Sequence, residues 1–127
     1  MSGAVSLALG ALGGAIAVAL GAFGAHALKA KLPVETLSVF QTGVQYQMMH
    51  SLALIAVGLW IERQPDLNLL AYAAAAFLFG IVCFSGSLYA LALGGPRWLG
   101  PVTPLGGTLF IVGWLLLAAA ALSQQSP

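Results

Sequence analysis

The charged residues of the chain fall at three places and leave long apolar stretches between them. Stretches without Asp, Glu, Lys or Arg cover residues 1–28, 36–61, 67–96 and 98–127. Each is longer than the roughly 20 apolar residues that a helix needs to cross a bilayer. Runs such as Leu70 to Phe79 do not alternate between apolar and polar residues, as the strands of a membrane barrel do. The pattern therefore predicts an all-α, polytopic membrane protein with a four-transmembrane-helix bundle.

The four stretches form a single domain, residues 1–127, with spans expected at about 4–25, 42–62, 68–93 and 104–123. The second helix should begin before its membrane part, because Pro33 suits a first helical turn and Glu35 complements the helix dipole there. A helix from about 33 to 62 would be roughly 45 Å long, at 1.5 Å per residue. Its first ten residues are therefore expected at or beyond the membrane surface.

The fourth helix follows a turn formed by Gly100 to Pro104. Within this turn, Thr103 is the expected N-cap and Pro104 the first helical residue, since both types favour these positions. The tail after Ser123 is polar and is expected to fray.

The first stretch also has one feature of a secretory signal. Ala25-His26-Ala27 has the small residues of a cleavage site. However, no Lys or Arg precedes the apolar run, and the run is longer than a usual signal core. We therefore interpret it as a permanent span.

Composition changes the picture by excluding several classes of protein. Hydrophobic residues make up 61% of the chain and charged residues 6%, whereas soluble domains carry about 25% charged residues. The net charge is +1 with no basic or acidic tract, so nucleic acid is not an expected partner. Cys83 is the only cysteine, which excludes an internal disulfide and a CxxC pair. The expected partners are the lipid bilayer and either a second copy of the chain or a larger membrane complex.

The basic residues also predict an orientation. The first and third connections carry Lys29, Lys31 and Arg97, and the second carries Arg63 alone. Short loops rich in Lys and Arg stay in the cytoplasm. The first and third loops are therefore expected in the cytoplasm, with both termini on the other side of the membrane.

Small residues recur every seven positions in three of the predicted helices. Helices in lipid associate through close backbone contact, which small residues allow. We therefore interpret these stripes as packing seams inside the bundle, or for the first helix as a homodimer seam. The steps run through Gly3, Gly10, Ala17 and Gly24 in the first helix, Gly80, Ser87 and Gly94 in the third, and Gly106, Gly113 and Ala120 in the fourth. The expected packing residues are Gly10, Gly14, Gly21, Gly24, Gly80, Gly86, Gly106 and Gly113.

Many polar side chains lie in the second predicted helix, and two interpretations of their role remain open. They can form hydrogen bonds between helices, because unpaired polar groups are costly in hydrocarbon. Alternatively, they can line a pocket for a small molecule, a quinone or a lipid headgroup. The candidate patch, with contributions from the first and third helices, consists of His26, Gln41, Thr42, Gln45, Tyr46, Gln47, His50, Ser85, Ser87 and Tyr89. Ser51, four residues after Gln47, extends it.

More specific chemistry finds little support in the sequence. His26 and His50 differ in expected depth by about 10 Å, which disfavours haem ligation by both. No carboxylate lies inside a span, so a mixed-ligand zinc site or a proton relay lacks its residues. A Ser85–His50 dyad has no further support. We therefore predict no catalytic residue, no metal and no cofactor.

Four strings of the chain resemble the signatures of a known family. They are residues 21–28, 40–54, 85–89 and 99–107, and together they resemble the YgdD-like family of small membrane proteins, whose function is not known. The resemblance covers almost the whole chain. It implies a helical bundle in the bacterial inner membrane, with a related small protein in animals, but no activity. It marks His26, Gln41, Thr42, Gly43, Tyr46, His50, Ser85, Gly86, Tyr89, Pro101 and Pro104.

Two functional hypotheses follow. The first is a non-catalytic accessory or scaffold protein that packs with itself or with a larger membrane complex. The second is a binder or minor transporter of a small molecule, quinone or lipid that uses the intramembrane His, Gln and Tyr residues.

Overall fold

Four helical spans form the protein. In the computed structural model, which describes residues 1–125, four helices are long and apolar enough to cross a membrane. The all-α, four-helix prediction is therefore confirmed. The elements are α1 (Gly3–Phe23), the π-helical turn η1 (Gly24–Leu28), α2 (Val34–Arg63), α3 (Asn68–Gly80), the π-helical turn η2 (Ile81–Ser85), α4 (Gly86–Ala92), the 3-10 turn η3 (Arg97–Leu99) and α5 (Val102–Ser123).

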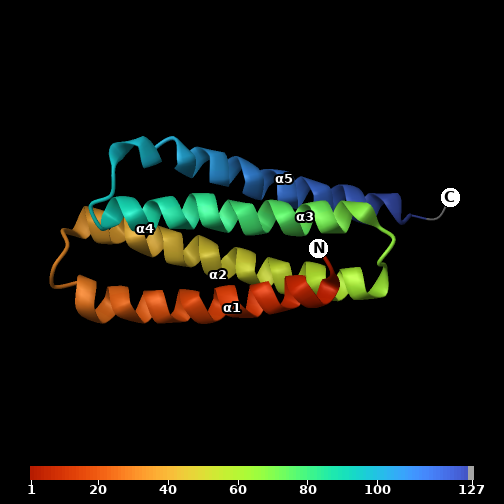
Figure 1. The fold of residues 1–127 in the computed structure, drawn as a ribbon, viewed down its shortest axis with the longest axis horizontal. Coiled ribbons are helices and arrows are strands. Elements are labelled where there is room, and N and C mark those ends of the chain that lie inside the picture. The colour runs from red at the N-terminus through yellow and green to blue at the C-terminus, as the bar shows by residue number, and fades with distance from the viewer. Residues whose placement is uncertain (126–127) are drawn as a thin grey trace.

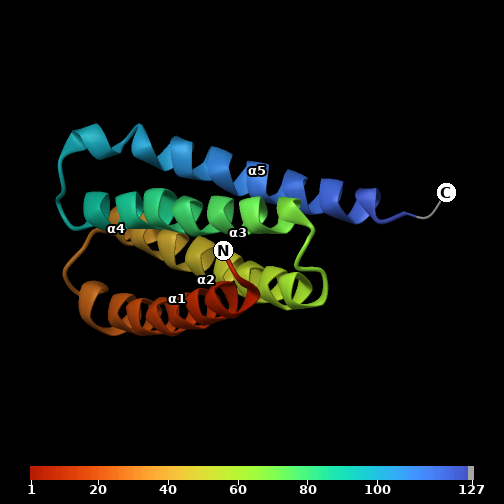
Figure 2. The same ribbon diagram turned by 45° about the vertical axis from the view of Figure 1, so that its right-hand side comes forward.

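The spans lie side by side in a row. α1 packs along α2, the α3–η2–α4 span packs on α2, and α5 packs along α3 and η2. In both views α1 and α5 lie at opposite edges, with α2 and the third span between them (Figures 1 and 2). The two inner spans are consequently more covered than the two outer ones, whose sides away from the row face the surroundings.

Helix starts follow the sequence in part. The Ser2 hydroxyl accepts a hydrogen bond from the Val5 amide and caps α1, and Pro33 is the N-cap of α2, one position before its first residue. The prediction for α5 was wrong, because the helix begins at Val102 and contains Thr103 and Pro104. The Thr103 hydroxyl pairs with Ser87 on α4 instead of capping the helix. Of the predicted frayed tail, Ser126 and Pro127 lie outside the described residues.

Glycines let α1 and α2 approach to backbone contact. A Cβ added at Gly3 would lie 2.7 Å from the Gly58 carbonyl oxygen, and one at Gly10 would lie 2.7 Å from the Ser51 carbonyl oxygen. Both distances are shorter than a carbon side chain tolerates. The glycines of α1 therefore face α2 within the same molecule.

The third span and α5 meet through a second set of small residues. The Gly106 backbone lies against the backbone of Phe84, and a Cβ on Gly80 would lie 2.5 Å from the Phe110 ring. A Cβ on Gly113 would lie 2.6 Å from the Phe77 ring. Each glycine thus makes room for an aromatic residue or a backbone segment of the neighbouring helix.

Several glycines of the predicted seams make no such contact. Gly86 is exposed, and a Cβ there would meet nothing within 4 Å; its assignment as a packing residue was wrong. Gly94 lies in the turn after α4 with a φ of 92°, a conformation that glycine adopts without strain. The contacts of Gly14 and Gly21 are ordinary or only slightly tight, at 3.9 Å from Met48 and 3.3 Å from Val44.

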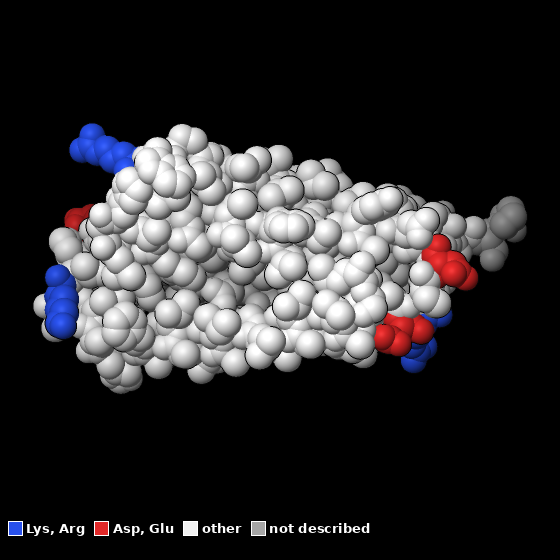
Figure 3. Space-filling model, in the orientation of Figure 1, with Lys and Arg blue, Asp and Glu red and all other residues white. Residues whose placement is uncertain are grey.

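Charge is confined to the two ends of the row. Lys and Arg side chains, with acidic side chains beside them, lie at the left and right ends of the molecule, and the surface between is uncharged (Figure 3). Such a band suits the hydrocarbon layer of a bilayer. Residues with polar side chains inside this band must therefore find partners within the protein or in something bound to it.

Candidate functional site: two polar clusters between the helices

The candidate patch divides into separate groups in the structure. Tyr46 and His50 face α5, whereas Gln47 faces α1 and the third span. This division follows from the helical repeat, since neighbouring residues on a helix point about 100° apart. We call the first group, Tyr46, His50 and Trp114, the histidine cluster, and the second group, Gly13, Gln47 and Tyr89, the glutamine cluster.

The histidine cluster fixes the proton of His50 on one nitrogen. Its Nδ1 lies 2.8 Å from the Tyr46 carbonyl oxygen, which can only accept a hydrogen bond. Its Nε2 lies 3.0 Å from the Trp114 indole nitrogen, which can only donate. His50 is therefore a neutral imidazole with its hydrogen on Nδ1. Neither nitrogen is left for a metal or for proton transfer.

Aromatic rings surround the imidazole. The Phe110 ring stacks on His50 with 3.6 Å between centroids and 10° between planes, and Phe77 lies on another side at 5.5 Å. His50 is 2% exposed. The cluster thus joins α2, α3 and α5 around one buried polar ring.

The glutamine cluster joins α1, α2 and α4 in a directed chain. The Tyr89 hydroxyl donates to Oε1 of Gln47 over 2.6 Å. Nε2 of the same amide donates to the Gly13 carbonyl oxygen over 2.8 Å. The buried amide is consequently satisfied on both its oxygen and its nitrogen, by two different helices.

Serine hydroxyls make further links between the spans. Ser85 in η2 donates to the Gly43 carbonyl oxygen on α2, and Ser87 pairs with Thr103 on α5. Ser6 on α1 donates to the Leu54 carbonyl oxygen on α2. Ser51 differs, because its buried hydroxyl has no hydrogen-bond partner among the described residues and packs against Gly13.

The remaining candidates do not join either cluster. His26, Gln41 and Gln45 are exposed, and the Thr42 hydroxyl donates to the Ser38 carbonyl oxygen of its own helix. His26 lies in η1, at the end of the first span. These residues lie towards the charged end of the molecule that carries Lys29 and Lys31.

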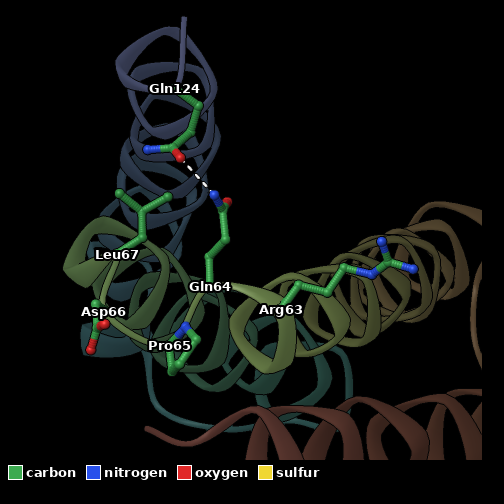
Figure 4. Close-up of a pocket in the computed structure, with 6 residues that line it drawn as sticks. All are labelled: Arg63, Gln64, Pro65, Asp66, Leu67 and Gln124. Atoms are coloured by element: carbon green, nitrogen blue, oxygen red, sulfur yellow. Dashed lines mark hydrogen bonds between the residues drawn. The ribbon is translucent and has the colours of Figure 1, made fainter. Parts of the chain in front are cut away.

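A hollow of about 410 Å³ lies at the opposite end, between the α2–α3 connection and the end of α5. Gln64 crosses it, accepting from the Trp60 indole and donating to Gln124, each over 2.6 Å. Arg63 and Asp66 point away from each other (Figure 4). The hollow therefore has no converging charged groups, and its glutamines tie the end of α5 to the loop.

The sequence interpretation missed the partners more than the polar residues themselves. Trp114, Gly13 and Ser6 each form an interhelical hydrogen bond and were not among the candidates. In the sequence, Trp114 is not distinguished from the apolar residues around it in the fourth stretch. A backbone carbonyl such as that of Gly13 is present in every residue, so the sequence does not show which one accepts a hydrogen bond. A tryptophan in an apolar span, whose N–H needs a partner, was the available signal.

Comparison with known proteins points to one family. Residues 20–107 match the model of a protein family of unknown function, DUF423. The chain is 48% identical to a UPF0382 membrane protein of Staphylococcus epidermidis over 93% of this chain and 95% of the relative. It is 43% identical to the UPF0382 membrane protein YwdK of Bacillus subtilis, over 92% and 95%. It is 42% identical to the inner membrane protein YgdD of Escherichia coli, over 96% and 84%. No solved structure matches the chain.

Proposed function

The chain belongs to the DUF423 (UPF0382) family of membrane proteins, and we propose that it is a non-catalytic accessory or scaffold protein of the bacterial inner membrane. In this role it packs within the bilayer against a second copy of itself or against a larger membrane complex. The observation that supports the proposal most directly is that the buried polar side chains are engaged in hydrogen bonds within the protein. The buried imidazole, amide and most of the buried hydroxyls bond to other parts of the same chain.

Catalysis would require groups that these bonds do not leave free. A general base needs a nitrogen within reach of a substrate proton, and both nitrogens of His50 are engaged. A nucleophilic serine needs an adjacent base, and the Ser85 hydroxyl donates to a backbone carbonyl. Hydrogen bonds between helices in lipid stabilise a fold by about 0.6 kcal/mol each. Hydrogen bonding between the spans therefore explains the polar residues better than catalysis does.

Lateral packing is supported by the outer side of α1. The side of α1 that faces away from α2 carries exposed alanines at three- and four-residue steps, namely Ala4, Ala8, Ala11, Ala15, Ala19 and Ala22. Small residues at such steps let a second membrane helix approach closely. Because α1 is an edge of the row, a neighbour can reach this side without disturbing the other spans (Figure 1).

Cross-linking in intact membranes tests the packing role. We expect a photoreactive amino acid at Ala15 to form an adduct either with a second copy of the chain or with one defined membrane protein. A hetero-adduct supports the proposal only if deleting the chain alters that protein's complex on a native gel. The adjacent Ile16, also exposed but on the bulky flank of the helix, is the control and should react mainly with lipid. Adducts with lipid alone at both positions would contradict the role.

The orientation belongs to the same proposal. Lys29, Lys31 and Arg97 lie at one end of the row, and Arg63 lies at the other with Glu62 and Asp66. The excess of basic residues supports placing the first end in the cytoplasm. Both termini then lie outside it.

A second candidate function is supported by one feature of the histidine cluster. An open groove of about 470 Å³ runs beside it, between α2, η2 and α5. Ligand sites are typically concave and mostly apolar, with a few polar groups. The protein would then be a binder of a small membrane-soluble molecule.

A further inference from the structure

The groove beside the histidine cluster opens towards the hydrocarbon layer. Its walls include Tyr46 and Met49 of α2, Phe84 of η2, and Thr108 and Trp114 of α5. Met49 and Tyr46 are partly exposed at its mouth, and both lie in α2 between the charged residues at its two ends. A molecule that enters here must therefore come from the bilayer, and it must be apolar for most of its length.

The inner wall is built from flat rings. Tyr46 lies 4.8 Å from Phe84 between ring centroids, and Phe84 lies 5.4 Å from Phe110. Aromatic rings form offset-stacked or edge-to-face contacts with another flat ring, which add to the gain from buried area. A planar headgroup can make such contacts with this wall.

One polar group on the wall lacks a partner. Within residues 1–125, the hydroxyl of Tyr89 donates to Gln47, whereas the hydroxyl of Tyr46 makes no hydrogen bond to the protein. Tyr46 is 12 residues past the start of α2, about 18 Å along the helix. The expected membrane segment starts near residue 42, which places the Tyr46 backbone about 6 Å inside its boundary. A hydroxyl facing hydrocarbon gains from an acceptor, which a bound molecule can supply.

A second hydroxyl offers the complementary function. Thr108 donates its hydrogen to the Pro104 carbonyl oxygen over 2.9 Å and retains lone pairs that can accept. The groove thus offers one donor and one acceptor, and charged side chains lie only at the ends of the row. A neutral ring that carries carbonyl or hydroxyl groups matches these features.

The backbone at the groove is itself unusual. Phe84 lies in the π-helical turn η2, in the middle of the third span. Single π-helical turns within α-helices are found frequently at functional sites. The irregular turn brings Phe84 against Gly106 of α5 and so shapes the groove's inner wall.

We propose that this groove binds the headgroup of a neutral, membrane-soluble quinone or quinol. The ring lies against Tyr46 and Phe84, and a ring oxygen accepts a hydrogen bond from the Tyr46 hydroxyl. The isoprenoid tail leaves through the open side into the bilayer. This inference rests on the second candidate function and is independent of the accessory role.

Binding can be followed through Trp114, which lines the groove. In a Trp60→Phe, Trp98→Phe background it is the only tryptophan, and a quinone beside it quenches its fluorescence. The protein is placed in phospholipid nanodiscs and titrated with decylubiquinone or menadione. We expect saturable quenching by at least one of the two. Quenching that only rises linearly with quinone in the bilayer, for both probes, would overturn the proposal.

A matched pair of tyrosine variants tests the hydrogen bond. Tyr46→Phe is expected to weaken binding about three- to fifteen-fold, the range expected for one hydrogen bond in a membrane protein. Tyr89→Phe removes a hydroxyl that is bonded to Gln47 and does not line this groove, so it should leave the midpoint unchanged. Equal midpoints for Tyr46→Phe and the parent protein would contradict the proposed contact.

A variant on α5 separates loss of quinone binding from loss of the fold. Gly107 lines the groove, and a Cβ there would lie 3.7 Å from the Phe84 ring, an ordinary contact distance. Gly107→Val is therefore expected to fill the groove and abolish saturable quenching while circular dichroism shows unchanged helix content. Mass spectrometry of lipids that copurify with the protein provides a second readout. Copurified phospholipid without quinone, from membranes that contain quinone, would overturn the ligand class and leave the accessory role untouched.

Discussion

At the scale of single residues, His50 shows how the interior of the row is held together. A carbonyl on one side and an indole N–H on the other allow only one tautomer. The stacked Phe110 ring closes a third side. Both ring nitrogens of His50, the residue that most resembles a catalytic group or a metal ligand, are therefore hydrogen-bonded within the protein. The same applies to the buried amide of Gln47.

The indole of Trp114 should matter for stability through its N–H. Trp114→Phe leaves Nε2 of His50 without a donor inside the span, and we expect the free energy of unfolding to fall by about 0.6 to 1.7 kcal/mol. Titration with a denaturing detergent, followed by circular dichroism, measures it. Trp98→Phe is the control, because Trp98 is 69% exposed. An equal, small change in the free energy of unfolding of both variants would count against a stabilising hydrogen bond between Trp114 and His50.

Polar residues could be found from the sequence, but their grouping could not. An unusual density of Gln, Tyr, His and Ser in one apolar stretch identified Gln47 and His50 correctly as residues that need partners. Their assignment to opposite sides of α2 depends on which helices flank α2, and one sequence does not show this. The partner atoms at Gly13 and Tyr46 are backbone carbonyls, which every residue carries.

At the scale of elements, glycine spacing and π-helical turns decide how the helices meet. The seven-residue step on α1 places Gly3, Gly10 and Gly24 towards α2. Gly86 lies one position before Ser87, which continues the seven-residue step from Gly80; Ser87 is buried, whereas Gly86 faces open space. The π-helical turn η2, between Gly80 and Gly86, has no clear sequence signal, so it was not predictable.

Two adjacent glycines of α5 provide a direct test of close packing. A Cβ at Gly106 would collide with the backbone of Phe84, whereas one at Gly107 would meet only ordinary contacts. We expect Gly106→Ala to lower the free energy of unfolding by about 1 to 3 kcal/mol through overpacking. Gly107→Ala should be neutral or slightly stabilising, since alanine favours helix. The same detergent titration compares the two, and a stable Gly106→Ala protein would argue against the close approach of α5 and η2.

At the scale of the whole molecule, the row leaves two outer helices with uncovered sides. The sequence predicts the number of spans and their approximate limits, because charge is excluded from the hydrocarbon layer. It does not distinguish a row from a closed square of helices, since apolar residues are spread around every span and do not mark one buried side. The arrangement α1, α2, third span and α5 follows from which small residues meet (Figures 1 and 2).

Cysteine labelling determines the orientation. With Cys83 replaced by Ala, single cysteines at Lys31 and Asp66 lie in connections at opposite ends of the row. In intact spheroplasts, a membrane-impermeant maleimide should label the cysteine at position 66 and react with that at position 31 only after lysis. Labelling in the reverse order would place both termini in the cytoplasm.

Native mass spectrometry of the chain, released gently from its own membrane, tests the central claim most directly. If the protein acts by packing with other membrane helices, its 13.0 kDa mass should appear together with a second copy or with another polypeptide in a defined ratio. The Trp114→Phe protein should keep this association, because the tie to His50 lies inside one chain. A bare single chain under the mildest extraction would contradict the account.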